Sequence, residues 1–231
     1  IASGVEATPA RRRVGAQTFR NGLLRVMIAK ELRLLWRDPA LLSQVVLRAL
    51  YMVPLLFVSI RNAHHHLLAA LAMSAAILVF VTSQVSATLT WITINAEDAP
   101  ELIATAPVAL YRARIAKLAA ALIPVAALVA VPILFLLAIM PWAGIIALLG
   151  VATVSAATGA LNLWYERPGK RGAMRQRSSG SVLVAIGEIL IGMLGGGATG
   201  LAAYGSLWGL LPAAILGGVM VIAYEGRSRA S

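Results

Sequence analysis

Two ionisable residues, Arg48 and Glu188, lie well inside long apolar stretches of this sequence. A charged group is costly to bury in apolar surroundings, so such groups usually pair with an opposite charge or face water. We predict that Arg48 and Glu188 meet as an ion pair in the folded protein. The alternative is that Arg48 extends to a polar surface while Glu188 is protonated or faces water.

Hydroxyl groups recur along another apolar stretch as a polar stripe. They belong to Thr82, Ser86, Thr90 and Thr93. Such a stripe can line a path for a substrate, but hydroxyls within apolar helices more often bond to the backbone or to neighbouring helices. We therefore expect these side chains to serve packing, with path lining as the alternative.

The sequence offers no convincing catalytic or metal-binding set. The consecutive residues His64, His65 and His66 cannot all face one ion from a helix, and no acid lies near them, so we expect a solvated loop. The chain has no cysteine, which excludes a disulfide framework and a thiolate metal site. We expect neither a catalytic residue nor a bound metal.

A charged segment, NAEDAPELIATAPVALYRARIAK, interrupts the apolar sequence at residues 95–117. Its DAPE stretch has the form of a capping box, in which Asp98 accepts from the first backbone N–H groups of a helix and Glu101 reaches back. We predict a short helix over residues 99–105, which Pro107 ends. Such a capped helix could serve as a binding surface for a partner protein. The alternative is an ordinary loop that turns the chain.

The overall composition indicates the elements that must hold these residues. Of the 231 residues, 60% are hydrophobic and 13% are charged, whereas soluble domains carry about 25% charged residues. A helix needs roughly 20 mainly apolar residues to cross a bilayer. We predict an all-α polytopic membrane protein. Its six transmembrane helices cover residues 40–60, 68–92, 118–140, 143–163, 182–203 and 206–224.

The chain divides into four predicted parts. Residues 1–18 are small, polar and basic, as in a disordered linker or tail. Residues 19–38 form an amphipathic helix that lies in the membrane interface. The six-span domain covers residues 39–225, and residues 226–231 form a cytoplasmic tail. The interfacial helix has an apolar face of Leu24, Ile28, Leu32, Leu35 and Trp36 and a charged face of Lys30, Arg33 and Arg37.

The net charge of +11 follows the predicted membrane topology. With the N-terminus in the cytoplasm, all 20 lysines and arginines except Arg48 and Arg61 fall on the cytoplasmic side, as the positive-inside rule predicts. The positive charge therefore gives no support to nucleic-acid binding, and both termini are expected in the cytoplasm. Tryptophans are enriched at the ends of membrane spans, where they form an aromatic belt. The tryptophans expected at span ends here are Trp91, Trp142, Trp164 and Trp208.

In their order and spacing these motifs resemble the membrane-spanning units of ABC exporter permeases, which have six spans per unit. The positions that match the family's cytoplasmic coupling segment are Glu97, Asp98, Leu102, Pro107, Val108 and Lys117. Those that match its interfacial helix are Lys30, Glu31, Arg37, Asp38 and Pro39. The resemblance covers about residues 20–225, the C-terminal half of a larger permease. The chain departs from it near Gly205, where the connection is too short for the re-entrant element of many members.

The resemblance implies a subunit that moves its substrate by alternating conformations and performs no chemistry of its own. A separate ATPase chain would bind ATP and Mg²⁺, because this chain lacks the phosphate-binding GxxxxGK[ST] motif, and no cofactor is expected here. A second permease half or a second copy would complete the path in the inner membrane of a bacterium. The implied coupling residues are Glu97, Asp98, Glu101, Leu102, Pro107, Lys30 and Glu31.

Two other functions stay open at this point. A membrane-embedded enzyme or lipid-processing protein would need polar residues that converge at one depth. A membrane scaffold outside the ABC class would need no such site. Binding of a cognate ATPase to residues 97–117 would argue against both.

Overall fold

The computed structural model describes residues 22–37, 66–95, 110–165 and 179–230, together with single positions between 43 and 61. All regular elements in this part of the chain are helices, so the predicted all-α class is confirmed for it. Five helices are long and apolar enough to cross a membrane. This number of apolar helices indicates a membrane protein.

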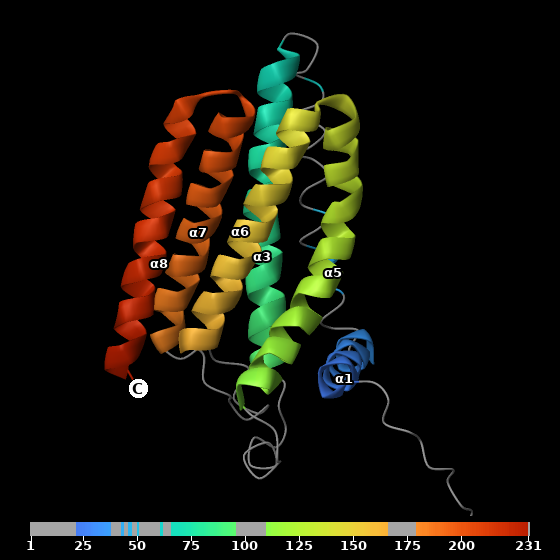
Figure 1. Cartoon of the computed structure of the whole chain (residues 1–231), viewed down its shortest axis with the longest axis vertical. Helices are drawn as coiled ribbons and strands as arrows, with labels where there is room; N and C mark the ends of the chain where they lie inside the picture. The colour runs from blue at the N-terminus through green and yellow to red at the C-terminus, as the bar shows by residue number, and fades with distance from the viewer. Residues whose placement is uncertain are drawn as a thin grey trace, which may run out of the picture.

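The five apolar helices stand side by side in one bundle (Figure 1). They are α3 (Leu67–Asn95), α5 (Leu110–Ile139), α6 (Pro141–Tyr165), α7 (Ser179–Ala203) and α8 (Leu210–Ala230), with a 3₁₀ turn, η2 (Leu207–Gly209), before α8. The helix α1 (Leu23–Arg37) lies across one end of the bundle beside α5. We call this end the lower end, as it is drawn in Figure 1, and the opposite end the upper end.

Part of the predicted topology falls outside the described residues. The first predicted span, residues 40–60, is described only at positions 43, 46, 47 and 50, which are helical. This first span, the tail at residues 1–18 and the short helix at residues 99–105 therefore stay predictions.

The other five predicted spans correspond to helices of the structure, with differences at their ends. Helix α5 begins at Leu110 rather than at residue 118, because the basic turns that precede the apolar stretch continue the same helix. Helix α8 runs on to Ala230, through most of the segment predicted as a tail. Helix α7 is continuous through its glycines up to Ala203, so it is a regular span rather than a re-entrant element.

The core of the bundle forms around α3, which packs against α5, α6 and α7. The largest fully buried apolar side chains of α3 are Leu78, Val79, Val85 and Ile92. Helices α5 and α8 lie at the two edges, where α5 contacts α6 and α8 contacts α7. Residues of α3, α6 and α7 therefore have the greatest opportunity to meet one another away from lipid.

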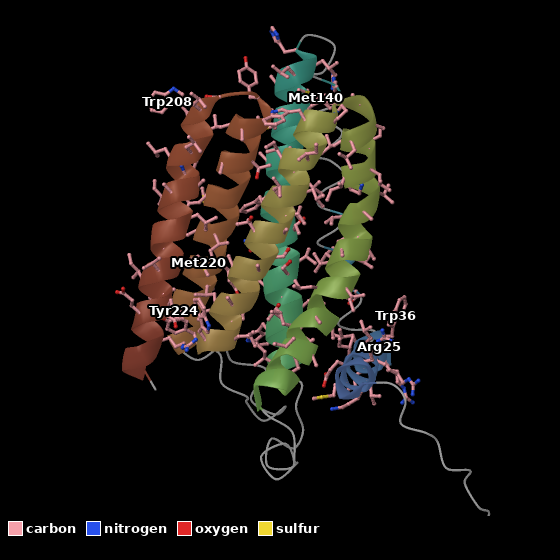
Figure 2. All side chains as sticks on the ribbon, viewed as in Figure 1. Arg25, Trp36, Met140, Trp208, Met220 and Tyr224 are labelled. Atoms are coloured by element: carbon pink, nitrogen blue, oxygen red, sulfur yellow. The ribbon has the colours of Figure 1, made fainter. Side chains whose placement is uncertain are left out.

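Two tight turns close the helical hairpins at the upper end, where Figure 2 labels Met140 and Trp208. Met140 alone separates α5 from α6, so the two helices form an antiparallel hairpin. Pro141 starts α6, a position where its missing N–H costs nothing. Gly144 is required by space, since a Cβ there would lie 2.7 Å from the Cα atom of Leu137.

The turn between α7 and α8 uses a left-handed glycine. Gly205 has φ +85°, a conformation that residues with a Cβ rarely adopt. The N–H of Ser206 donates to the carbonyl of Leu201 over 2.9 Å, as in a Schellman helix end. The Ser206 hydroxyl then accepts from the N–H of Trp208 over 3.3 Å and caps η2. The short connection is thus complete without any re-entrant segment.

Helix α1 is amphipathic, but its faces differ from the prediction at Trp36. Leu35 is buried and Ile28 and Leu32 are half-buried, as expected. Trp36, predicted on the same face, is 73% exposed. Glu31 is buried on the covered side, where the ammonium group of Lys30 lies 3.3 Å from its carboxylate. A charge thus shares the packed face of α1 because its neighbour neutralises it.

Candidate functional site

Buried polar side chains gather where α3, α6 and α7 meet, and we call this set the polar core. On α3 they include the whole predicted stripe, and on α6 and α7 they include an amide and a carboxyl group. The set consists of Thr82, Ser83, Ser86, Thr90, Thr93, Ser155, Thr158, Asn162 and Glu188. Each is at most 7% exposed. Burying polar side chains is unfavourable unless they form hydrogen bonds, so the hydrogen bonds of the polar core must offset the cost of its burial.

Several hydroxyls of the polar core bond to their own helix. The Thr82 hydroxyl donates to the carbonyl of Leu78 over 2.6 Å, and that of Thr93 donates to the carbonyl of Thr90 over 2.9 Å. The Thr158 hydroxyl lies 2.8 Å from the carbonyl oxygen of Val154. Such bonds let a threonine sit in an apolar helix without an unsatisfied donor.

Other bonds tie the three helices together. The hydroxyls of Ser86 and Ser155 lie 3.0 Å apart and join α3 to α6. The Gln84 side-chain amide lies 3.4 Å from the backbone carbonyl of Glu188, a long bond that joins α3 to α7. The Asn162 amide donates to the Glu188 carboxylate over 2.9 Å and joins α6 to α7. The polar core therefore fixes how these helices sit against one another.

The bond between Asn162 and Glu188 places a carboxyl group inside the bundle. Glu188 lies six residues into the candidate span Val182–Ala203, which is about 9 Å from its lower end. It is 5% exposed. Helical side chains tilt toward the N-terminus of their helix, so Glu188 reaches down toward Asn162 near the lower end of α6. The predicted partner Arg48 lies outside the described residues, and the predicted pair stays a prediction.

The orientation of the Asn162 amide is settled by its second bond. Its nitrogen also donates to the carbonyl of Thr158 over 2.9 Å, and a carbonyl can only accept. The Asn162 amide oxygen therefore points elsewhere, and it has no hydrogen-bond partner among the described residues. The same holds for the hydroxyls of Ser83 and Thr90. Buried polar atoms are usually satisfied, so these three atoms leave hydrogen-bonding capacity of the polar core unused among the described residues.

A row of glycines brings α7 close to α3 beside the polar core. A Cβ on Gly196 would lie 2.8 Å from the backbone oxygen of Ala76, and one on Gly200 would lie 2.8 Å from the Cβ atom of Ala76. On Gly192 it would lie 3.2 Å from the Ser83 hydroxyl. The glycines therefore allow helix contact, in keeping with their spacing of four residues.

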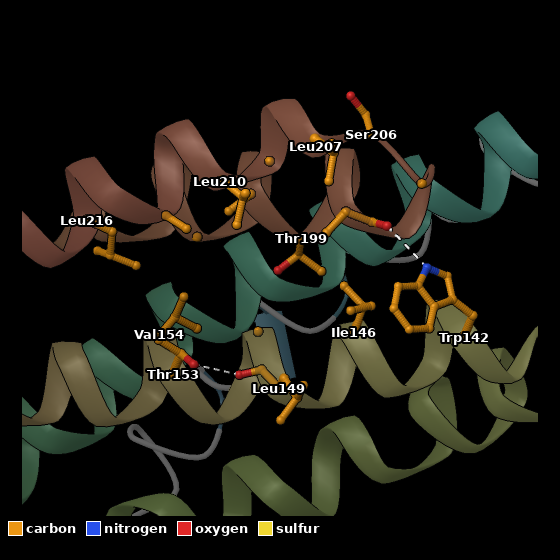
Figure 3. Close-up of a pocket in the computed structure, with 17 residues that line it drawn as sticks. Trp142, Ile146, Leu149, Thr153, Val154, Thr199, Ser206, Leu207, Leu210 and Leu216 are labelled. Atoms are coloured by element: carbon orange, nitrogen blue, oxygen red, sulfur yellow. Dashed lines mark hydrogen bonds between the residues drawn. The ribbon is translucent and has the colours of Figure 1, made fainter.

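Two apolar grooves lie on the bundle, and the predicted stripe lines neither of them. One, of about 370 Å³, lies between α6, α7 and α8 (Figure 3). It contains Thr153, whose hydroxyl donates to the carbonyl of Leu149, and Trp142, whose indole N–H donates to the carbonyl of Ala202. The other, of about 610 Å³, lies between α5 and α6 and includes Ser155. In this conformation the stripe packs within the bundle, and path lining stays a prediction.

Of the predicted coupling residues, the described part contains two. Lys30 is exposed on α1, whereas Glu31 is buried and bonded to it. The remainder, Glu97, Asp98, Glu101, Leu102 and Pro107, lie outside the described residues. A partner that approached α1 would therefore meet Lys30, and Glu31 would hold Lys30 in place.

Among the described residues, no three histidine, cysteine or acidic side chains are placed to hold a metal ion. His66 is exposed, and His64 and His65 lie outside the described part. Sequence reasoning missed Asn162. Its signal was an amide within an apolar stretch, close to the same end of a neighbouring span as Glu188.

Comparison with known proteins adds no relative. No protein-family model matches the chain, and neither a curated protein nor a solved structure matches it.

Proposed function

We propose that this chain is the membrane-spanning permease subunit of an ABC-type exporter in a bacterial inner membrane. A separate ATPase would supply ATP hydrolysis, and a second half or second copy would complete the path. The chain itself would perform no chemistry. The lower end would face the cytoplasm, because the described bases of α1, α5 and α8 belong to that end.

One observation carries the proposal. Helix α1 and the start of α5 are more than 70 residues apart in sequence, yet they pack against each other at the lower end (Figure 1). Helix α1 holds Lys30 and Glu31, and α5 begins with the last residues of the charged segment 95–117. The helix that resembles the family's interfacial helix and the described end of the charged segment are therefore neighbours. A partner bound at this end could push on both at once.

The connection from this surface to the bundle is direct. Lys117, the last residue of the charged segment, is buried on α5. Helix α5 packs against α3 and α6, which carry most of the polar core. A force on the lower end of α5 therefore reaches the centre of the bundle through a continuous helix rather than through a loop.

The experiment is a pull-down of the solubilised full-length protein from its native membrane, with co-purifying chains identified by mass spectrometry. We expect an ATPase that contains the GxxxxGK[ST] motif. The triple variant Glu97→Ala/Asp98→Ala/Glu101→Ala should lose it. The variant Glu166→Ala/Glu225→Ala is the control, because it removes two acids that lie elsewhere in the sequence and leaves residues 95–117 intact. It should keep the ATPase.

Two results would contradict the proposal. Absence of any ATPase from the unmodified preparation would favour a stand-alone membrane protein, either a scaffold or a lipid-processing enzyme. Equal loss in the triple variant and in the control would show that binding depends on general charge rather than on the segment. For an enzyme, the polar core offers one carboxyl group, Glu188, among its described residues, and no observation favours that alternative.

A further inference from the structure

The lower ends of α6 and α8 carry an aromatic–arginine cluster that the proposed transport function does not use. It consists of Trp164 and Tyr165 on α6 and Tyr224 and Arg227 on α8. The rings of Trp164 and Tyr224 meet edge to face, with centroids 5.5 Å apart. The Tyr165 hydroxyl donates to the carbonyl of Ala223 over 2.8 Å. These contacts fasten α8 to α6 at the lower end, where Figure 2 labels Tyr224.

The guanidinium of Arg227 rests against both rings. Its Cζ atom lies 4.9 Å from the centroid of Tyr224 and 5.9 Å from that of Trp164. Both distances are within the range of a cation–π interaction. The rings therefore restrict where the guanidinium lies, so that less entropy is lost when it binds a ligand.

Among the described residues, none uses the hydrogen-bonding capacity of Arg227. The side chain is exposed, and in the part of the chain that the structure describes it makes neither a hydrogen bond nor an ion pair. A guanidinium carries five N–H donors in a planar fork that matches an anionic oxygen pair. Glu225 does not compete for them, because residues two apart on a helix point to opposite sides. Within the described part of the chain, the cluster thus presents a fixed cation whose N–H donors have no protein partner.

The position of the cluster indicates which anion it meets. Tyr165 and Arg227 are the last residues of two candidate spans, Pro141–Tyr165 and Leu207–Arg227. Span ends lie at the level of lipid headgroups, where tryptophan and tyrosine are also enriched. Directly after Tyr165, the sequence of residues 166–178 contains five lysines and arginines. The local charge therefore favours an anionic lipid over a zwitterionic one.

We infer that the aromatic–arginine cluster binds the headgroup phosphate of an anionic phospholipid in the leaflet at the lower end. Arg227 contacts the phosphate oxygens, Trp164 and Tyr224 hold the guanidinium, and the acyl chains lie along α6 and α8. The inference requires only that these two helices span the membrane. It does not depend on the ATPase partner, so either proposal can fail without the other.

The test is native mass spectrometry of the detergent-solubilised full-length protein, titrated in parallel with phosphatidylglycerol, phosphatidylcholine and inorganic phosphate. We expect tighter binding of phosphatidylglycerol than of phosphatidylcholine, and no binding of free phosphate. Arg227→Gln should weaken the first phosphatidylglycerol about fivefold, as expected for one base at a lipid surface, and leave phosphatidylcholine unchanged. Arg61→Gln removes the same charge from the opposite predicted side and should change neither.

A second variant keeps the test decisive if Arg227→Gln folds poorly. Arg227→Lys retains the charge but loses the planar fork, so its affinity for phosphatidylglycerol should fall between those of the unmodified chain and Arg227→Gln. The inference is wrong if Arg227→Gln lowers the melting temperature without changing lipid preference, since the cluster then only fastens α8 to α6. Equal loss in Arg61→Gln, or competition by inorganic phosphate, would also overturn it.

Discussion

The most apolar stretches of the spans formed by α3 and by η2 with α8 have nearly equal mean hydropathy, yet the two helices occupy opposite environments. In α3, 61% of the apolar span is buried inside the protein, whereas in α8 the share is 11%. The amount of apolar sequence therefore does not decide which helix lies at the centre. What distinguishes α3 is its row of hydroxyls and its contact with the glycines of α7. Within a membrane, polar and small residues mark the protein interior, because lipid is as apolar as leucine.

The comparison predicts that the largest losses follow damage to the buried charge. Glu188→Gln and Arg48→Gln should each lower the free energy of unfolding by about 3–5 kcal/mol, since either leaves one charge buried without its predicted partner. The double variant should recover most of the loss. Denaturant titration in detergent measures these values, and Glu225→Gln on the exposed side of α8 is the control. A double variant no more stable than the worse single variant would disprove the pair.

A smaller difference in stability is expected between alanine substitutions at a glycine that faces α3 and at a glycine on α8. Gly196→Ala places a Cβ 2.8 Å from the backbone oxygen of Ala76, and overpacking of this kind costs about 1–3 kcal/mol. Gly217→Ala on α8 meets no atom within 4 Å, so it should be neutral or stabilise the protein by up to about 1 kcal/mol. Thermal unfolding of both variants in one detergent compares them. Equal destabilisation would mean that α8 is as closely packed as α3.

The smallest effect should come from a single bond between helices. In a double-mutant cycle, Ser86→Ala and Ser155→Ala should show a coupling energy of about 0.6 kcal/mol, typical of hydrogen bonds between membrane helices. Thr153→Ala should be additive with Ser86→Ala, because the Thr153 hydroxyl bonds within its own helix. The cycle is measured by denaturant titration. Coupling near zero would mean that the two hydroxyls, 3.0 Å apart, do not hold α3 to α6.

Much of the helical architecture was predictable from the sequence. Apolar length located five helices to within a few residues at most ends, because the bilayer sets a minimum span. The tryptophans 91, 142, 164 and 208 lie within about a turn of helix ends, as predicted. The start of α5 was misplaced, since hydropathy marks where the apolar stretch begins and not where the helix begins.

The arrangement of the polar core was less predictable. Buried polar residues stood out singly, but hydropathy does not say which helices are neighbours or how they rotate. Asn162 and Glu188 could be placed near one end of adjacent spans, yet their bond depends on the close packing of α6 on α7. Similarly, periodicity assigned Trp36 to the apolar face of α1, but it did not show which residues of that face α5 would cover.

The single-residue turn at Met140 also limits how the bundle can open. Because only Met140 joins them, α5 and α6 cannot separate at the upper end. A rotation of α5 therefore pivots at Met140, and the displacement of α5 grows along the helix toward its lower end. The 30 residues of α5 span about 45 Å, so each degree of rotation moves Leu110 by about 0.8 Å. The displacement is therefore largest toward the lower end of α5, where α5 packs against α1. The same movement is negligible beside Met140.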